Sequence, residues 1–343
     1  MNFYCISPKT HKITSCETRN KTDFRTMIEL IFKDNTQRQF FDNFDSILIS
    51  DDVAAIQCID FGEQEQTWMA NTFSIDLSIL TRMDDIEISS HYYYIGNQLS
   101  MQFALPCIHE SSELIETSLT IIMIEGKIIS FLQSSLEKSF MQLHSSKKYY
   151  DTIKMNTVEE LFVNLIAIFS DYYADLTELI AKRIKNIAEK ILRKKEFSAN
   201  DLDLITELNF DNIMIKESIN EFQRILMMIK KDNVFENAVQ ERIGNELNDL
   251  VAVTDYIQYN FDRLDDLKDN VSNKIDLEQN KIFKILTIVT VCIAIPTFIA
   301  GVYGMNFNNL PLAHWQYGYL VVIVLMVLSV ALLLVFFKRK KWF

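Results

Sequence analysis

The stretch FIAGVYGMNFNNLPLAHWQYGYLVV, residues 298–322, lies between two long apolar runs and contains no Lys, Arg, Asp or Glu. The uncharged region around it extends over 53 residues, 285–337. Within that region, residues 285–303 and 318–337 supply 19 and 20 uncharged positions, and about 20 apolar residues are needed to cross the hydrocarbon core of a bilayer. Soluble cores rarely run so long without a charge, so we predict two membrane-spanning helices rather than two buried core helices.

Basic residues flank the two predicted spans and are absent from the loop between them. Lys281 and Lys284 precede the first span, and the tail KRKKWF (338–343) follows the second. Because basic loops stay on the cytoplasmic side, both chain ends are expected in the cytoplasm and the short loop outside. The N-terminal sequence MNFYCISPKTHK lacks the apolar core of a signal peptide. We therefore expect a multi-pass protein of the cell (inner or plasma) membrane.

The charge and motif content argues against several classes of function. The net charge is −12, and without the +4 of the tail it is −16. Phosphate binding needs a basic patch, so nucleic acid is not an expected partner, whereas an acidic chain accumulates cations. Five cysteines without a Cys-x-x-Cys pair indicate a reducing compartment. The sequence has no glycine-rich phosphate loop, no Gly-x-Ser-x-Gly and no His/Cys metal spacing, which predicts neither an enzyme nor a nucleotide site.

The charged part of the chain divides into two regions by its pattern. Residues 1–150 are expected to form a cytoplasmic α/β domain, with β-rich segments at 54–61, 91–105 and 119–133 and helix-like segments at 25–34 and 68–83. The last β segment has Glu125-Gly126 at its centre and predicts a hairpin. Residues 151–280 are expected to form a helical stalk, because Gly244 is the single Gly, and no Pro occurs, between Gly126 and Pro296.

Three helices are expected in the stalk region. The first begins near residue 155, and the sequence SAND (198–201) offers an N-cap for the second. The third begins near residue 234 and continues without a break into the first membrane span, so that it would be about 100 Å long at 1.5 Å per residue. Residues 281–343 then form a transmembrane hairpin with an outer loop and a basic cytoplasmic tail. The predicted class is an α+β cytoplasmic domain, long stalk helices and two C-terminal transmembrane helices.

The first span has a face suited to a pore. Its residues follow one another at steps of 3, 4, 4, 3, 4 and 3: Phe283, Leu286, Thr290, Ala294, Thr297, Gly301 and Gly304. This is the seam of a helix packed against copies of itself around an axis. A two-span subunit cannot enclose a pore alone, so several copies would contribute one helix each. The alternative is that the Thr hydroxyls bond back to carbonyls one turn earlier and the glycines only permit close packing.

The same face indicates the kind of ion that would pass. No fixed charge lies within it, and Thr hydroxyls alone do not compensate for stripping water from a small divalent cation. A hydrated cation, contacting oxygens through its water shell, is the better fit. The first span runs outward, so its partially negative C-terminal end and the Asn306 amide oxygens face the outside and attract cations.

The residues Tyr303-Gly304-Met305-Asn306-Phe307 resemble the signature of the CorA family of magnesium channels, Gly-Met-Asn at the end of the first of two C-terminal spans. The resemblance continues through KILTIVTVCIAIPTFIAGVYGMNF (284–307), WQYGY (315–319) and the basic tail. Individual residues and motifs resemble the family over about residues 265–343. Over the rest of the chain only the general architecture resembles it.

This resemblance implies a funnel-shaped homopentamer that imports Mg²⁺ passively, with Co²⁺ and Ni²⁺ as further candidate ions. It also implies a selectivity filter of Gly304, Met305 and Asn306, with the outer-pore threonine at Thr297. Hydrophobic gate positions would be Leu286 and Phe283. Asp269 would be the acidic pore position just below the membrane. Mg²⁺ would be both the transported ion and, bound between subunits, the regulatory ion that closes the channel.

Two features depart from the family pattern. Many relatives have an acidic residue in an outer-loop run similar to MPEL, whereas this chain has LPLA, with Leu312 at that position. The regulatory carboxylates do not align clearly either. Candidates near the expected regions are Asp84 and Asp85 in the N-terminal domain and Glu246 and Asp249 in the stalk; for each of them an exposed, solvating carboxylate is the favoured interpretation.

Two other functions are compatible with this architecture. A zinc transporter of the same superfamily is the nearer one, although such relatives tend to carry Ile where this chain has Met305. A membrane-anchored coiled-coil sensor or scaffold is the other, although an anchor would not need the Thr/Gly/Asn face. Membrane lipid and further copies of the chain are the expected partners.

Overall fold

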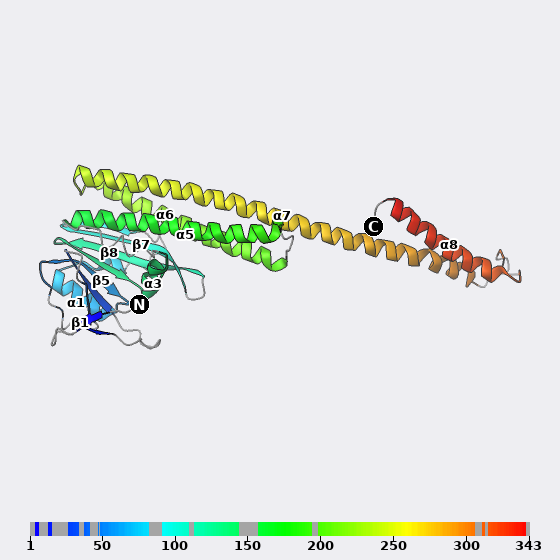
Figure 1. The fold of residues 1–343 in the computed structure, drawn as a ribbon, viewed down its shortest axis with the longest axis horizontal. Coiled ribbons are helices and arrows are strands. Elements are labelled where there is room, and N and C mark those ends of the chain that lie inside the picture. Colours follow the sequence, from blue (N-terminus) through cyan, green and yellow to red (C-terminus); the bar gives the residue numbers. More distant parts are fainter. Residues whose placement is uncertain are drawn as a thin grey trace. The chain divides into compact units, whose positions relative to one another are not determined.

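The computed structural model describes residues 4–6, 13–15, 27–33, 38–41, 47, 49–81, 91–109, 113–143, 157–193, 198–305, 311–312 and 315–340. The chain forms two compact units, Met1–Asp265 and Asp266–Phe343. Figure 1 shows an N-terminal sheet and helices in the first unit and two helices in the second. The predicted division into residues 1–150, 151–280 and 281–343 stays a prediction.

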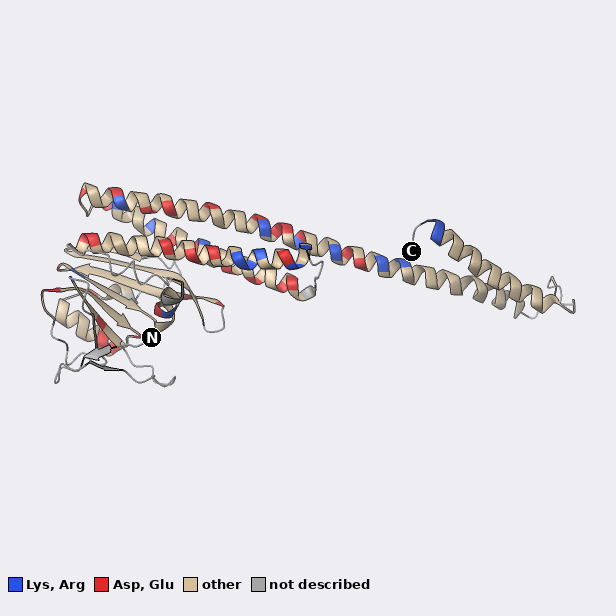
Figure 2. Ribbon diagram, in the orientation of Figure 1, with Lys and Arg blue, Asp and Glu red and all other residues tan. Residues whose placement is uncertain are grey.

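The second unit contains the end of α7 (Asn237–Tyr303) and α8 (Gly318–Arg339). Figure 2 shows charged residues along the first part of α7 and again only at the end of α8. Both helices are long and apolar enough to cross a membrane, and only 6% and 11% of the residues in their most apolar 18-residue windows are buried. Buried core helices would show the opposite, and the two apolar helices expected at the C-terminal end are confirmed.

A tight turn leads into α8. Leu312 has a left-handed backbone with φ of 67°. Its carbonyl oxygen accepts from the Trp315 N–H at 3.2 Å, and the Trp315 carbonyl accepts from the Gly318 N–H at 2.9 Å. A Cβ atom added to Gly318 would collide with the Leu312 carbonyl oxygen. Gly318 is therefore required here because the two backbone segments touch.

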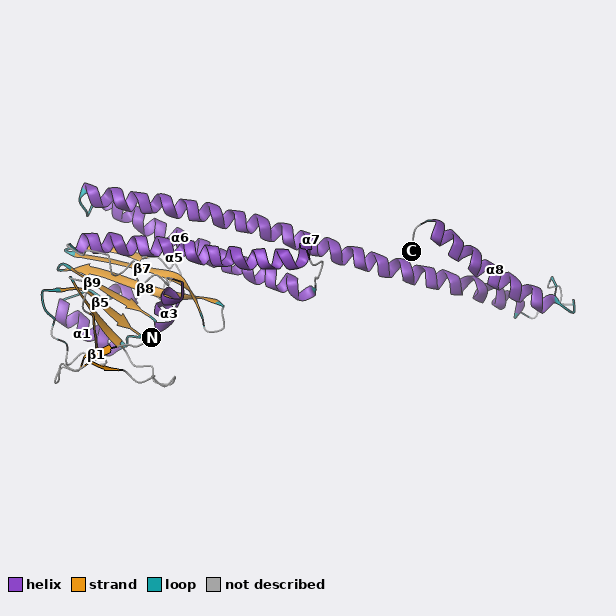
Figure 3. Ribbon diagram, in the orientation of Figure 1, coloured by secondary structure: helices purple, strands orange, loops and turns teal. Residues whose placement is uncertain are grey.

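The first unit is built on a seven-stranded sheet in the order β4-β3-β5-β9-β8-β7-β6 (Figure 3). All neighbours are antiparallel except β5 and β9, which are parallel. A separate pair is formed by β1 (Tyr4–Ile6) and β2 (Ile13–Ser15). The strands of the large sheet are β3 (Met27–Phe32), β4 (Arg38–Phe41), β5 (Val53–Ile59), β6 (His91–Ile95), β7 (Gln98–Ile108), β8 (Leu114–Ile124) and β9 (Lys127–Leu132).

The predicted hairpin at Glu125-Gly126 is confirmed. The two residues join β8 to β9 with positive φ angles of 48° and 72°. Two positive φ values in a two-residue connection are those of a type I′ turn, which matches the right-handed twist of the paired strands. The segment 91–105, expected as one β-rich run, contains a second hairpin, because Gly96 (φ 62°) lies at the turn between β6 and β7.

The helix expected at 25–34 is wrong. Residues Met27–Phe32 form β3, which pairs with β4 on one side and β5 on the other. A six-residue apolar run such as MIELIF fits either helix or strand by periodicity, and pairing with two neighbours decides for the strand. The helix expected at 68–83 is interrupted. It consists of α1 (Glu63–Phe73), which ends at Ser74 with φ of 51°, and α2 (Ser78–Thr81).

Helices cover both faces of the sheet. On one face, Met69 and Phe73 of α1 pack with Ile28, Ile56 and Phe131 in a buried core. On the other, α5 (Val158–Ala188) and α6 (Ala199–Asp232) lie against β7, and α3 (Ser134–Leu143) packs beside them. The Phe103 ring of β7 lies 5.7 Å from that of Phe169 and 4.8 Å from that of Phe222. These aromatic contacts join the α/β part to the helices.

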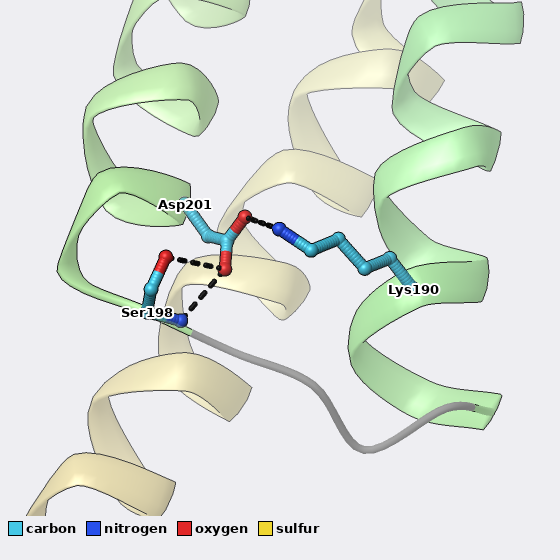
Figure 4. A network of polar contacts seen from close by, with 3 residues as sticks. All are labelled: Lys190, Ser198 and Asp201. Carbon is cyan, nitrogen blue, oxygen red and sulfur yellow. Dashed lines mark hydrogen bonds and ion pairs between the residues drawn. The ribbon is translucent and has the colours of Figure 1, made fainter.

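A capping network joins α5 to α6 (Figure 4). The Asp201 carboxylate accepts from the Ser198 N–H at 2.7 Å and from the Lys190 ammonium at 2.7 Å. Lys190 belongs to the π-helical turn Glu189–Arg193 that follows α5. Because Lys190 pairs with it, the pKa of Asp201 is lowered. The N-cap predicted from SAND is thus confirmed, with Ser198 at the cap and Asp201 closing the capping box.

Candidate ion pathway

The residues predicted to line a pore lie on one open face of α7. Phe283 and Leu286 are 62% and 59% exposed. Thr290, Ala294, Thr297, Gly301 and Gly304 are exposed as well. On the other side of the helix, Ile288 is only 4% exposed, and further residues there are partly covered: Val291, Cys292, Ile295, Ile299 and Val302. The structure therefore brings the described pore candidates together on the side of α7 that the single chain leaves open.

The threonine hydroxyls on this helix donate hydrogen bonds to the backbone. The Oγ1 atoms of Thr287, Thr290 and Thr297 each lie 2.8 Å from the carbonyl oxygen four residues earlier. The back-bonding alternative is thus correct for all three. A hydroxyl has one hydrogen and two lone pairs, so each oxygen keeps accepting capacity after the hydrogen is used. Such an oxygen accepts hydrogen bonds from water molecules that surround a cation.

On the open face, α7 ends with two glycines, Gly301 and Gly304. The Gly304 N–H donates to the Ala300 carbonyl at 2.9 Å, and the Met305 N–H donates to the Val302 carbonyl at 3.3 Å. A Cβ on Gly304 would lie 3.2 Å from the Ala300 oxygen, whereas one on Gly301 would meet nothing within 4 Å. The C-terminal end of a helix is partially negative. Asn306, predicted as the selectivity residue, lies outside the described residues.

Asp269 is exposed on α7, fourteen residues before Phe283. Fourteen residues are two heptads, so Asp269 lies near the same side of the helix as the predicted gate residues. Phe283 and Leu286 follow it as the apolar part of the face. The order along α7 is therefore carboxylate, apolar residues, then hydroxyls and glycines.

The stalk carboxylates Glu246 and Asp249 lie on the part of α7 in the first unit. Burial raises the pKa of Glu246, the polar Ser170 side chain near it opposes this shift, and the nearby Asp249 and Asp171 carboxylates raise it further. Asp171 of α5 is a neighbour that sequence reasoning missed. The sequence offers no signal for this neighbour, because only the fold places α5 beside α7, where Arg242 donates to Asn164 Oδ1 at 2.8 Å.

The other regulatory candidates come from the N-terminal domain. Asp84 and Asp85 lie outside the described residues. Within the described ranges, no group of three or more His, Cys, Asp or Glu side chains is arranged so as to hold a metal ion. The assignment of Glu246 and Asp249 as regulatory ligands stays a prediction.

Comparisons with known proteins agree with this arrangement. Residues 56–339, well over half of the chain, match the family described as CorA-like Mg²⁺ transporter protein. The magnesium transport protein CorA of Wolinella succinogenes is 24% identical over 81% of this chain and 87% of its own length. The protein of the same name from Campylobacter jejuni is 25% identical over 88% of this chain and 94% of its own length.

A solved structure shares the fold. The complete structure of the CorA magnesium transporter from Methanocaldococcus jannaschii covers 94% of this chain and 99% of its own, with a TM-score of 0.73 and 21% identity. The α+β domain, long helices and two C-terminal apolar helices are therefore a known architecture. The matching family is one of membrane transporters rather than a class of enzymes. Because its match spans both the sheet and the two apolar helices, the chain belongs to the family of CorA-like Mg²⁺ transporter proteins.

Proposed function

We propose that this protein carries Mg²⁺ passively across the membrane, down its electrochemical gradient, through a pore lined by α7 helices of several copies. The observation that carries the proposal is the open face of α7, on which the described pore candidates are exposed while Ile288 on the other side is 4% exposed. A single pair of spanning helices cannot surround a channel. Copies that pack through this face would enclose one, in keeping with family membership.

The chemistry of the face favours an ion that keeps its water. No charged residue lies between residues 285 and 337, so nothing there replaces the hydration shell of a divalent cation. The Thr290 and Thr297 hydroxyls donate their hydrogens to backbone carbonyls, and their oxygens retain lone pairs that can accept hydrogen bonds. Waters bound to a cation are good donors, and these oxygens accept from them. An anion, which presents acceptor groups outward, finds no donor in them.

The proposed filter is formed by Gly304, Met305 and Asn306 from each copy. The Asn306 amide oxygens would form a ring that accepts from the ion's waters, next to the partially negative ends of the α7 helices. Gly304 permits the close backbone geometry at that end. Phe283 and Leu286 would form an apolar constriction that closes by excluding water. Asp269 would attract cations before this constriction.

We infer a homopentamer in the cell membrane with both chain ends in the cytoplasm. The number of copies comes from the resemblance of the Gly-Met-Asn region, and the orientation from Lys281, Lys284 and the basic tail. Cytosolic Mg²⁺ would hold the channel closed by binding carboxylates between copies. Glu246, Asp249 and the neighbouring Asp171 are the candidates in the stalk, with Asp84 and Asp85 as candidates from an adjacent copy. Co²⁺ and Ni²⁺ are further ions that the pathway would pass.

The experiment that tests the proposal is Mg²⁺ flux into proteoliposomes containing the full-length chain. We expect Asn306→Ala to abolish flux and Asn308→Ala, the same change two residues later, to retain it. Flux is expected to fall as internal Mg²⁺ rises to millimolar concentrations. Normal flux through Asn306→Ala would contradict the filter. Zn²⁺ flux without Mg²⁺ flux would indicate a zinc transporter, and no flux of either ion an anchored sensor or scaffold.

A further inference from the structure

Helices α6 and α7 each have a buried apolar seam in the first unit, and each seam contains one asparagine. On α6 the seam residues, all at most 2% exposed, recur at steps of three and four: Ile205, Leu208, Asn212, Ile215, Ile219, Phe222, Leu226 and Ile229. On α7 the buried seam residues are at most 1% exposed: Ile243, Leu250, Ile257, Asn260 and Leu264. Both patterns are those of coiled-coil core positions, where apolar residues are the rule.

The Asn212 side chain contacts α7 one turn away from Asn260. The Asn212 Nδ2 donates to the Ile257 carbonyl oxygen at 3.1 Å, across the two helices. Asn260 follows Ile257 by three residues, so it lies on the same face of α7, one turn further on. In an antiparallel pair this turn faces Asn212 and the preceding turn of α6. Both side chains are 0% exposed.

Three of the four amide atoms in this layer have no protein partner. Asn212 Oδ1, Asn260 Oδ1 and Asn260 Nδ2 are buried without a hydrogen bond to any described residue. Folded proteins pair nearly all such atoms, with protein or with ordered water, because an unpaired buried amide is costly. The two side chains make no direct hydrogen bond to each other. The layer therefore contains both a free donor and free acceptors in an otherwise apolar seam.

We propose that this layer, Asn212 and Asn260, is an internal hydration site. At least one ordered water molecule accepts a hydrogen bond from Asn260 Nδ2 and donates one to Asn212 Oδ1. Water suits these partners because it is both donor and acceptor, and the two neutral amides carry no charge that would hold an ion. A water bound in this way links α6 to α7 at one turn and makes the two asparagines energetically dependent on each other.

This dependence is tested with leucine substitutions and thermal unfolding of the full-length chain in detergent. If one water serves both amides, Asn212→Leu and Asn260→Leu each leave the other amide without its partner, so each single change lowers the unfolding midpoint. The double change leaves a wholly apolar layer, and its midpoint returns to that of the parent or above. The expected departure from additivity is roughly 2–4 °C.

Independent asparagines would behave differently. Each single leucine substitution would then raise or lower the unfolding midpoint by its own amount, and the shift in the double variant would equal the sum of the two single shifts. Such an additive result overturns the proposal. The matched control combines Asn260→Leu with Ile243→Val, more than four turns away on the same helix, and is expected to be additive. Gel filtration of each variant checks that the assembly is unchanged.

A direct measurement stands beside the variants in case a substituted chain does not fold. A density map of the full-length chain at a resolution that reveals ordered water is expected to show a water within hydrogen-bond distance of both amides. A map in which the Asn212 and Asn260 amides bond directly to each other, or in which both face dry apolar side chains, overturns the proposal.

Discussion

The Thr297 hydroxyl donates to the Ile293 carbonyl at 2.8 Å, one turn earlier on α7. Pro296 has no N–H to donate and weakens the backbone ladder at the same place. The threonine therefore serves the helix with its hydrogen, and its remaining lone pairs are available on the exposed face. The Thr297 side chain can therefore support the helix backbone and still offer an oxygen to the waters of a passing ion.

This arrangement predicts that the oxygen at position 297, rather than its bulk, supports transport. Thr297→Val keeps the shape and removes the oxygen, and we expect Mg²⁺ flux in proteoliposomes to fall by about tenfold, since each 1.4 kcal/mol of barrier is a factor of ten. Thr297→Ser should retain most of the flux. Ser329→Ala removes a hydroxyl from α8 instead, and should not alter it. Equal flux in Thr297→Val and the parent would show that the threonine serves only the helix.

Gly318→Ala is expected to change the stability of the chain, whereas Gly301→Ala is not. Gly318→Ala places a Cβ against the Leu312 carbonyl oxygen, so the turn into α8 must shift, and we expect a lower unfolding midpoint and lower yield. Gly301→Ala meets nothing within 4 Å in the single chain, so its unfolding midpoint should match the parent. If Gly301 lines the pore, its Mg²⁺ flux should nevertheless fall. An unchanged midpoint in Gly318→Ala would contradict the turn geometry.

The buried Asp211 carboxyl is expected to make the stability of the chain depend on pH. Burial raises its pKa from 3.8 to about 6, although Arg183 lies 3.5 Å away and opposes the shift. Between about pH 4 and pH 6 the folded chain holds a proton that the unfolded chain has lost. The stability linked to this group is therefore present at the acid end and lost as pH rises through 6.

The test is the unfolding midpoint of Asp211→Asn as a function of pH. We expect it to exceed that of the parent at pH 7 and to depend less on pH between 4 and 6. Asp203→Asn, an exposed carboxylate on the same helix, is the control and should follow the parent curve. A lower midpoint for Asp211→Asn at pH 7 would mean that pairing with Arg183 outweighs the cost of burial.

Removal of the Tyr172 hydroxyl is expected to lower the stability of the chain. The β6 strand pairs with β7 only from Gln98 to Gln102, and beyond that point helix side chains bind the β7 backbone. The Tyr172 hydroxyl donates to the Pro106 carbonyl at 2.7 Å, and the Ile108 N–H donates to Ser139 Oγ at 2.9 Å. Tyr172→Phe leaves the Pro106 carbonyl without this donor, and we expect a loss of about 1–3 kcal/mol.

Chemical unfolding of the full-length chain measures this loss. The control is Tyr94→Phe, a tyrosine on β6 that is 46% exposed, for which no change is expected. If both variants unfold alike, the hydroxyl of Tyr172 does not hold the helices to the edge of β7.

Much of the helical part could be predicted from the sequence because its signals are local. The uncharged runs, the scarcity of Gly and Pro, and the SAND cap are all properties of continuous segments of the chain, so α6 begins, and α7 and α8 begin and end, close to the predicted residues. The sheet was less predictable. MIELIF became a strand because β4 and β5 pair with it, and such partners lie outside any local window.

The candidate site divides in the same way. The order of Phe283, Thr290 and Thr297 on one face follows from helical periodicity alone, which is a property of the backbone. Several features required the tertiary structure, because they depend on residues distant in sequence: Asp171 beside Glu246, the pKa of Asp211, and the unpaired amides of Asn212 and Asn260. The sequence by itself thus determined the helices and the face that would line a pore. Only the packing of α5, α6 and α7 decided which polar groups are buried together, because burial is created by contacts between separate elements.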